Sequence, residues 1–307
     1  MADSNRTALY IMPEVTWNTK PSGDFQTLRY TGESLSHNIT AISSNEIRSD
    51  RMIPDLIHTQ KTGGGGINFE FSYGTFDALM QAALMGAWNT NVLVNAATAQ
   101  SFSIEKAHLD EAEYFLYTGM MVNSFSLNCK AGEIVTGSFD FLGGVPATPL
   151  AQSSGAGTVV AATTTDIFNA IGNVGTILEG GSSLVTDGIY LQEVNFTVNN
   201  NLRVRPAIGY DSPIGIGLGR CMVTGSITAY FADDRLFDKF FANTASSLSF
   251  VITDAATNNY TFLFDNIKFT SDRSAASGID TDIIETIEFQ ALYDSTNAQI
   301  KITRDPA

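Results

Sequence analysis

Residues 67–84 read INFEFSYGTFDALMQAAL, and this stretch decides the fold class. Its first part alternates apolar and polar residues, which is typical of a strand with one buried face. Its second part places apolar residues three and four positions apart, which predicts a helix with one apolar face. The apolar positions of the helix are Phe76, Leu79, Met80, Ala83 and Leu84. The stretch therefore predicts a strand that leads directly into a short helix.

The same order of features recurs in the second half of the chain. Residues 223–242 read VTGSITAYFADDRLFDKFFA, again a strand followed by helical spacing. A glycine-rich segment precedes each copy, GGGG at 63–66 and GIGLGR at 215–220. Asp77 and the pair Asp233 and Asp234 stand near the expected helix starts, where carboxylates cap free amides and favour the helix dipole. We expect them to be caps rather than catalytic acids.

Two further blocks also occur twice. Residues 34–50, SLSHNITAISSNEIRSD, match the order of residues 192–211, QEVNFTVNNNLRVRPAIGYD. Residues 101–143 and 249–294 each contain a two-strand turn followed by two long strands, rich in Val, Ile, Thr and Phe. Internal duplication of this kind indicates two copies of one structural unit.

These patterns predict a mainly β fold of two tandem β-sandwich or partial-barrel modules, each with a flanking α-helix. The first module with an N-terminal arm is expected at residues 1–145, and residues 1–30 are expected to order only on stacking. A Gly/Ser/Thr-rich connector is expected at 146–187, with short apolar runs that could pair as strands. The second module is expected at 188–307.

The composition of the chain disfavours several classes of function. The chain has 307 residues, a charged fraction of only 16% and a formal net charge of −15. Few surface charges suit a subunit whose surface lies against partners, and an acidic surface disfavours tight nucleic-acid binding. The start lacks the basic and apolar regions of a secretory signal, and no run approaches the roughly 20 apolar residues of a spanning helix. No membrane partner is expected.

Catalytic chemistry has no candidate in the sequence. His37, His58 and His108 stand in no zinc-binding spacing, and Cys129 and Cys221 have no close Cys or His partner. The glycine run lacks the Lys-Ser or Lys-Thr ending of a phosphate loop. We therefore expect no catalytic residues, no metal and no cofactor. Two alternatives stay open: an adhesion or carbohydrate-binding β-sandwich, which would show clustered exposed aromatics, and a glycosidase with paired carboxylates in a cleft.

The repeated blocks resemble one known family. FEFSYGTFDALMQAAL, VNNNLRVRPAIG and VTGSITAYFADDRLFDKF are similar to segments of the two-copy phage tail-tube proteins, whose pattern has an FELSYGT-like strand and a VTGxxxxYF strand. The resemblance extends from about Tyr30 to Tyr293. It implies β-sandwich modules with a flanking helix, whose strands join into a barrel around a channel. It also leans toward a siphovirus, a phage with a flexible, non-contractile tail.

The resemblance implies a structural role without enzymatic activity. Subunits would form rings, and the stacked rings would make the conduit for DNA ejection. Six modules surround the lumen in such rings, so a trimer with pseudo-sixfold symmetry is preferred over a hexamer, in which one half would only decorate the outside. Implied partners are other copies of the chain, a tape-measure protein, and the tail terminator and baseplate or tip proteins. Genomic DNA would pass without tight binding, repelled by lumen-facing carboxylates. The expected location is the virion tail, assembled in the host bacterial cytoplasm.

The resemblance also points to the residues that join rings. The polar connection from Ser43 to Gly66 would reach the next ring, where exposed ion pairs contribute about 0–1 kcal/mol each. A solvated surface loop is the alternative. The candidate ring-stacking and inter-subunit residues are Arg48, Asp50, Arg51, Asp55, Arg203, Arg205 and Asp211.

Overall fold

The computed structural model describes residues 3–150, 159–171, 174–275 and 278–307. Strands dominate, and within these residues the α-helices are α1 (Asp77–Ala83) and α2 (Arg235–Phe241). The prediction of a mainly β fold with a helix after each repeated strand is therefore confirmed. No described helix has the length and apolar character needed to cross a membrane.

Among the described residues, the first half of the chain forms a short 3-10 helix and ten strands beside α1. They are η1 (Ser4–Arg6), β1 (Thr7–Pro13), β2 (Gln26–Leu28), β3 (Gly32–Glu33), β4 (Ser36–Ser43), β5 (Leu56–Glu70), β6 (Val92–Val94), β7 (Ser101–His108), β8 (Glu113–Lys130), β9 (Thr136–Leu142) and β10 (Val145–Leu150). The second half forms ten more. They are β11 (Leu178–Glu179), β12 (Ser182–Ser183), β13 (Leu191–Asn199), β14 (Arg203–Val204), β15 (Ile216–Gly217), β16 (Met222–Tyr230), β17 (Ser246–Thr253), β18 (Asn259–Ala275), β19 (Ile284–Ala291) and β20 (Lys301–Asp305).

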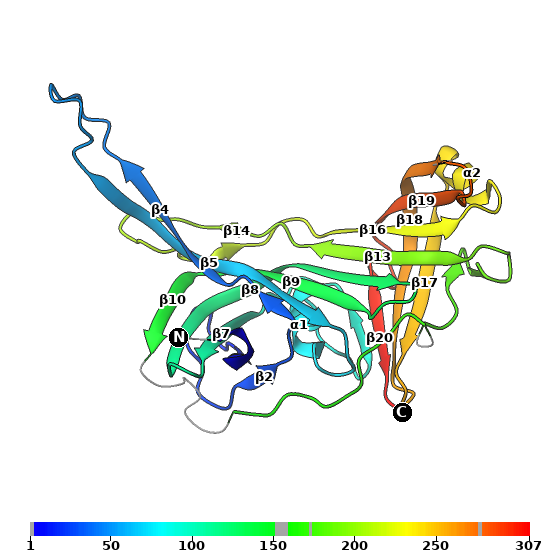
Figure 1. The fold of residues 1–307 in the computed structure, drawn as a ribbon, viewed down its shortest axis with the longest axis horizontal. Helices are drawn as coiled ribbons and strands as arrows, with labels where there is room; N and C mark the ends of the chain where they lie inside the picture. Colours follow the sequence, from blue (N-terminus) through cyan, green and yellow to red (C-terminus); the bar gives the residue numbers. More distant parts are fainter. Residues whose placement is uncertain (1–2, 151–158, 172–173, 276–277) are drawn as a thin grey trace.

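The pairing of the strands has the same order in both halves. In the first half β4 pairs with β5, β5 with β9 and β9 with β8, all antiparallel. In the second half β13 pairs with β16, β16 with β19 and β19 with β18, again antiparallel. The two sets join directly, because β8 pairs with β13 over seven residue pairs. These eight strands form a continuous sheet that runs through both halves (Figure 1).

The longest strands, β8 and β18, each belong to two layers. The first part of β8 pairs with β7 and β10, and its last part pairs with β9 and β13. The first part of β18 pairs with β17 and β20, and its last part pairs with β19. A bulge interrupts both long strands at the change of partners, after Val122 and after Phe269. Bulges bend a strand, which lets each long strand leave one layer and enter the next.

A single aromatic-rich core lies under this sheet. Phe69, Phe125, Phe139, Phe196 and Phe262 are all 1% exposed or less. Phe125 and Phe196 come from different halves, and their ring centroids lie 5.6 Å apart in an edge-on arrangement. Alternation along β5, β9, β8, β13 and β16 puts the apolar residues on this side of the sheet and the polar residues on the other. The halves therefore share their hydrophobic core.

Parts of the expected connector (146–187) and of the expected N-terminal segment (1–30) pack into this core. Phe168 is fully buried, with its ring centroid 5.2 Å from that of Phe71, and bridges at Val160 and Ile167 tie the segment to the first half. Residues 151–158 and 172–173 of the expected connector lie outside the described residues. Strand β1 pairs with both β7 and β2, so the expectation that residues 1–30 order only on stacking is wrong for this strand.

Helix α1 lies where the two halves meet. Asp77 was expected to cap α1, but no side chain caps this helix, and the Asp77 carboxylate accepts hydrogen bonds from the Tyr260 hydroxyl and the Arg304 guanidinium. The Arg304 guanidinium also stacks 4.5 Å from the ring centroid of Trp88. The carboxylate thus links the first half to the C-terminal strands. The Asp233 carboxylate does accept a backbone N–H near the start of α2, that of Arg235, at 3.1 Å.

Candidate functional site

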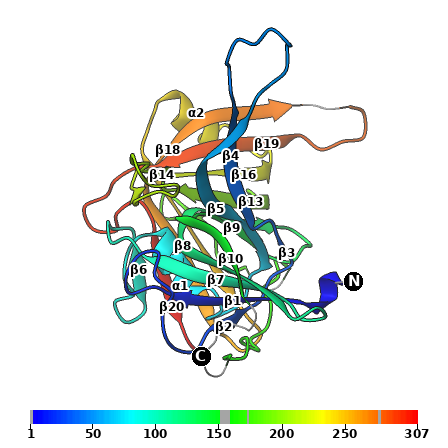
Figure 2. The same cartoon turned by 90° about the vertical axis from the view of Figure 1, so that its left-hand side faces the viewer.

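The most prominent feature of the outline is a long hairpin, which we call the arm: β4, residues 56–64 of β5 and the loop 44–55. It projects well beyond the rest of the chain in Figures 1 and 2. Every residue of β4 is exposed, and β4 has a β-sheet partner only in β5 and so leaves its other edge unpaired within the described chain. An unpaired edge recruits another strand, so β4 is a candidate assembly edge.

Four predicted site residues lie in the arm. Arg48 and Asp50 bind each other, with the guanidinium Nη2 2.6 Å from the carboxylate, and this contact lowers the pKa of Asp50. Arg51 adopts a positive φ of 60°, a turn conformation that is uncommon for a non-glycine residue. The backbone carbonyl of Asp55 accepts a hydrogen bond from the N–H of Ser44 and closes the loop. These residues shape the tip of the arm.

Sequence reasoning missed that the arm exposes several large apolar side chains. Ile47 is fully exposed, and Met52 and Ile53 are about 70% exposed. Other exposed apolar residues of the arm are Ile39, Ile42, Leu56 and Ile57. A concentration of exposed apolar side chains on a projecting hairpin is typical of a surface that becomes buried against a partner. The signal in the sequence is the set of isoleucines that stand between the charged residues of 44–57.

The other three predicted residues lie in the hairpin of residues 203–217, which contains β14 and β15. The N–H of Arg205 donates to the carbonyl of Gly215 across this hairpin. Asp211 binds Lys61 of the arm twice, through the side chains at 2.7 Å and through the backbone, where the Lys61 N–H donates to the Asp211 carbonyl at 2.8 Å. The structure thus places the 203–217 hairpin beside the arm (Figure 1).

The face of the sheet opposite the core is lined by hydroxyl and amide groups. Cross-strand hydrogen bonds link Ser126 to Ser138 at 2.8 Å and the Asn195 amide to Ser226 at 2.8 Å. The alternation of the strands puts four carboxylates and three cations on this face: Glu70, Asp140, Glu193, Glu288, Lys130, Lys268 and Arg273. Among the described strand residues the face is therefore polar and close to electrically balanced, not strongly acidic.

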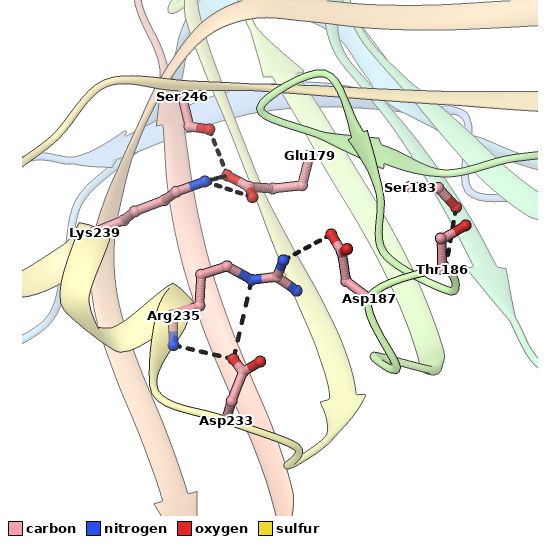
Figure 3. Close-up of polar contacts among 8 residues, drawn as sticks. All are labelled: Glu179, Ser183, Thr186, Asp187, Asp233, Arg235, Lys239 and Ser246. Atoms are coloured by element: carbon pink, nitrogen blue, oxygen red, sulfur yellow. Dashed lines mark hydrogen bonds and ion pairs between the residues drawn. The ribbon is translucent and has the colours of Figure 1, made fainter.

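A polar cluster fastens α2 to the β11–β12 hairpin (Figure 3). The Glu179 carboxylate is 3% exposed and accepts hydrogen bonds from the Lys239 ammonium at 2.6 and 2.7 Å and from the Ser246 hydroxyl. Arg235 binds Asp187 at 2.6 Å across the same contact. The buried Glu179 carboxylate, bound by a cation and a hydroxyl, links these elements of the fold. Glu179 and Asp187 are both engaged in these contacts, which leaves neither carboxylate free for acid–base chemistry.

The outer face of α2 is apolar and uncovered. Phe237 and Phe241 stack on each other at 6.0 Å, and they are 42% and 80% exposed. In the corresponding helix α1, Met80 and Ala83 are completely buried, and the Asn200 side chain of the second half donates to the Ala83 carbonyl. Exposed aromatics could also suit the carbohydrate-binding alternative, but the comparison between the helices favours cover by another copy of the chain.

Metal-binding side chains and thiols can be assessed among the described residues. They contain no group of three or more His, Cys, Asp or Glu side chains placed to hold a metal ion. Cys129 is buried in an apolar setting that raises the pKa of its thiol to about 12, so it is a poor nucleophile. Sequence reasoning also missed Asp272 and Glu285, neighbouring carboxylates at the edge of the second half, because their strand register was not readable from the pattern.

The fold and these surfaces define a structural protein of an assembly: a broad sheet with unpaired edges, a projecting apolar arm and an uncovered helix face. Comparison with protein families agrees, since the sequence model of the phage tail tube protein family matches residues 4–291. The chain belongs to this family and is a structural subunit of a phage tail tube, a component of the virion tail that assembles with copies of itself. None of the curated proteins compared matches the chain.

Proposed function

We propose that the chain forms rings of three subunits, which stack into the tube of a siphovirus tail and provide the conduit for DNA ejection. The observation that carries this proposal is the pairing of β8 with β13, which joins two four-stranded sets of the same order into one sheet. Three copies of an eight-stranded sheet make a barrel of 24 strands with six similar sectors. A closed barrel removes the exposed edges that a single chain has.

The polar face of the sheet is the proposed lining of the channel. Its hydroxyl and amide groups pair with one another across strands, as Ser126 does with Ser138, and so offer DNA few free donors. Carboxylates and cations are nearly balanced on this face, so repulsion of DNA arises from the net charge of −15 on each whole subunit. Such a lining neither holds phosphates nor concentrates counterions along the path, which suits a conduit.

The arm and the 203–217 hairpin are the proposed contacts between stacked rings. Their exposed apolar residues, with Ile47, Met52 and Ile53 at the arm tip, supply buried area on stacking. The ion pairs Arg48–Asp50 and Lys61–Asp211 are already satisfied within the subunit, so they hold the loops in shape for docking. Arg51, Asp55, Arg203 and Arg205 are the predicted residues outside these ion pairs, and they are left to contact the neighbouring ring.

The further partners follow from a tube of this kind. A tape-measure protein would occupy the lumen during assembly in the host cytoplasm, and a terminator and tip proteins would bind the two end rings. The two ends of the tube offer different surfaces, because the arm projects from one side of the sheet only (Figure 1). Each end therefore selects its own partner.

Electron microscopy of the purified chain tests this function. We expect hollow tubes at high protein concentration, with threefold symmetry in end-on views of rings. Sixfold rings of whole subunits would contradict two equivalent modules per chain but keep the tube, whereas persistent compact monomers in the presence of the tape-measure protein would contradict the function.

A matched pair of variants separates stacking from ring formation. Ile47→Ser with Ile53→Ser, in the arm tip, should give rings that no longer form tubes. Val15→Ser removes an apolar side chain that is 98% exposed outside the arm, and it should leave tubes intact. If the arm variant forms normal tubes, the arm is not part of the contact between stacked rings.

A further inference from the structure

The two long strands differ in one respect that matters for assembly. The last part of β8 has β9 on one edge and β13 on the other. The last part of β18, from Lys268 to Ala275, has β19 on one edge, and no described strand pairs with the other. At the opposite end of the sheet, β4 also has an unpaired edge. The subunit thus carries one open edge at each end of its eight-stranded sheet.

The two bulges give the correspondence between the halves residue by residue. Val122 faces Phe141 immediately before the bulge in β8, and Phe269 faces Phe289 immediately before the bulge in β18. Val122 therefore corresponds to Phe269. Counting onward through the equivalent bulges, Phe125 corresponds to Asp272.

The same counting applies to the neighbouring strands. Gly65 faces Phe141 in the first half and Gly225 faces Phe289 in the second, so these glycines correspond. From there the pairing of β4 with β5 and of β13 with β16 makes His37 the counterpart of Val198.

The β8–β13 junction provides the template for a junction between subunits. Within the chain Val198 faces Phe125, and Asn199 faces Ser124. Transferred to β4 of one subunit and β18 of the next, this register sets His37 opposite Asp272. It sets Asn38 opposite Ser271.

The two junctions differ in chemistry. Inside the chain the junction is apolar, with Phe125 and Val198 both fully buried. At the open edge of β18 the counterpart of Phe125 is Asp272, and Glu285 of the adjacent strand β19 lies near it. Glu285 is 3% exposed, and one carboxylate oxygen of Glu285 and one of Asp272 are buried without a hydrogen-bond partner. Burial, then the charges of Asp272 and Asp233, raise the pKa of Glu285 to about 7. These carboxylates face a place where the described chain supplies no cation.

The open edge of β4 has the complementary character. His37 stacks on the ring of Tyr117, with the centroids 6.2 Å apart, and so points to the core side of the sheet as Val198 does. Beside it lies a cavity of about 300 Å³, whose lining includes Lys106 and His108. Lys106 binds Glu33 at 2.5 Å, and His37 and His108 line the same cavity.

We propose, building on the tail-tube function above, that β4 of one subunit pairs with the last part of β18 of the next in the register of the β8–β13 junction, so that His37 enters the acidic site of Asp272 and Glu285. The intermolecular junction is thus a polar copy of the apolar one within the chain. A polar edge keeps the free subunit soluble, and the requirement for opposite charges rejects pairing of two like edges. The neighbouring Phe237 and Phe241 of α2 become covered by the same subunit that supplies His37.

Paired cysteines test the register. Directly opposed residues in a sheet lie about 4.5–5.5 Å apart between Cα atoms, within the range that a disulfide spans. Asn38→Cys with Ser271→Cys should therefore give, on oxidation of assembled protein, covalent trimers on a non-reducing gel. Ser36→Cys with Ser271→Cys is displaced by two residues, beyond about 7 Å, and should not cross-link. Asn199→Cys with Ser124→Cys should close within one chain and serves as the positive control.

The outcomes separate this inference from the function itself. If wild-type protein forms tubes but the Asn38/Ser271 pair does not cross-link, or the Ser36/Ser271 pair does, the proposed register is wrong and the tube stands. If wild-type protein forms no tubes under any condition, the function fails as well. Trimers at the Asn38/Ser271 pair alone support both.

A charge exchange tests the role of His37. His37→Asp alone and Asp272→Lys alone should each raise the protein concentration needed for assembly by tenfold or more, and the double variant should recover most of that loss. Val15→Asp, at a 98% exposed position outside the arm, is the matched control for an added charge. Thermal melts of the free subunits report whether each variant folds. Singles that assemble normally, or a double variant that is no better than the singles, would overturn the pairing of His37 with Asp272.

Discussion

Replacing Glu285 by glutamine is expected to stabilise the free subunit at pH 8 and to leave its stability nearly unchanged at pH 4. The folded chain raises the pKa of this carboxyl from 4.5 to about 7, first by burial and then through the charges of Asp272 and Asp233. The folded state therefore holds the proton more tightly than the unfolded state does. Stability falls as the pH rises from about 4.5 to about 7 and stays low above that.

The magnitude follows from the shift. One pKa unit corresponds to about 1.4 kcal/mol, so the ionised carboxylate costs the free subunit at most about 3 kcal/mol at pH 8. Glutamine has nearly the same shape and carries no charge, so it removes this cost without opening a cavity. Below pH 4.5 the glutamate is protonated in both states and the gain vanishes.

Urea unfolding of dilute, unassembled protein at pH 4 and pH 8 measures the effect. The urea concentration at the unfolding midpoint should rise for Glu285→Gln at pH 8 only. The slope of the unfolding free energy against urea concentration should stay unchanged. Glu288→Gln, an exposed position on the opposite face of β19, is the control and should change little at either pH. An equal gain at both pH values, or a loss at pH 8, would refute the reasoning that an unpaired buried charge is present.

Three other outcomes are expected. Asp77→Ala should lower the free energy of unfolding by about 2–4 kcal/mol in a urea titration, because it leaves the Tyr260 hydroxyl and the partly buried Arg304 without their shared acceptor. Phe241→Ser should change subunit stability by less than about 0.5 kcal/mol, since the ring is 80% exposed, yet sedimentation should show a higher concentration needed for assembly. Cys129 should resist alkylation at pH 8 in folded protein and react after unfolding, because its thiol has a pKa of about 12; fast labelling of the folded chain would contradict that burial.

Local periodicity in the sequence was enough to place the main elements. The alternation in residues 67–71 and the helical spacing that follows predict β5 and α1, and both depend only on neighbours a few positions apart. The recurrence of the pattern in residues 223–242 predicts β16 and α2 in the same way. The division into modules at 145 and 188 stays a prediction, and buried residues of both halves belong to one hydrophobic cluster.

Contacts between distant residues could not be predicted. Asp77 has the residue type and the position of a helix cap. Its carboxylate instead binds the side chains of Tyr260 and Arg304, which are 183 and 227 positions away in the sequence. Phe168 lies in a segment whose Gly, Ser and Thr content suggests a linker, yet it fills the core. The acidic edge of β18 was hidden because a one-residue change in register moves a side chain to the other face, and the bulge after Phe269 makes such a change.

The direct pairing of β8 with β13 has a consequence for the kinetics of assembly. In a ring of six separate modules every junction would have to form by diffusional encounter, and each encounter loses several kcal/mol of translational and rotational freedom. In the proposed three-subunit ring, alternate junctions would form when the chain folds, at the high effective concentration that a tether provides. Nucleating a ring of this kind then requires a three-body event instead of a six-body one, so the delay before growth should depend on a lower power of subunit concentration. Tethering the halves shortens the slowest step in building the tube.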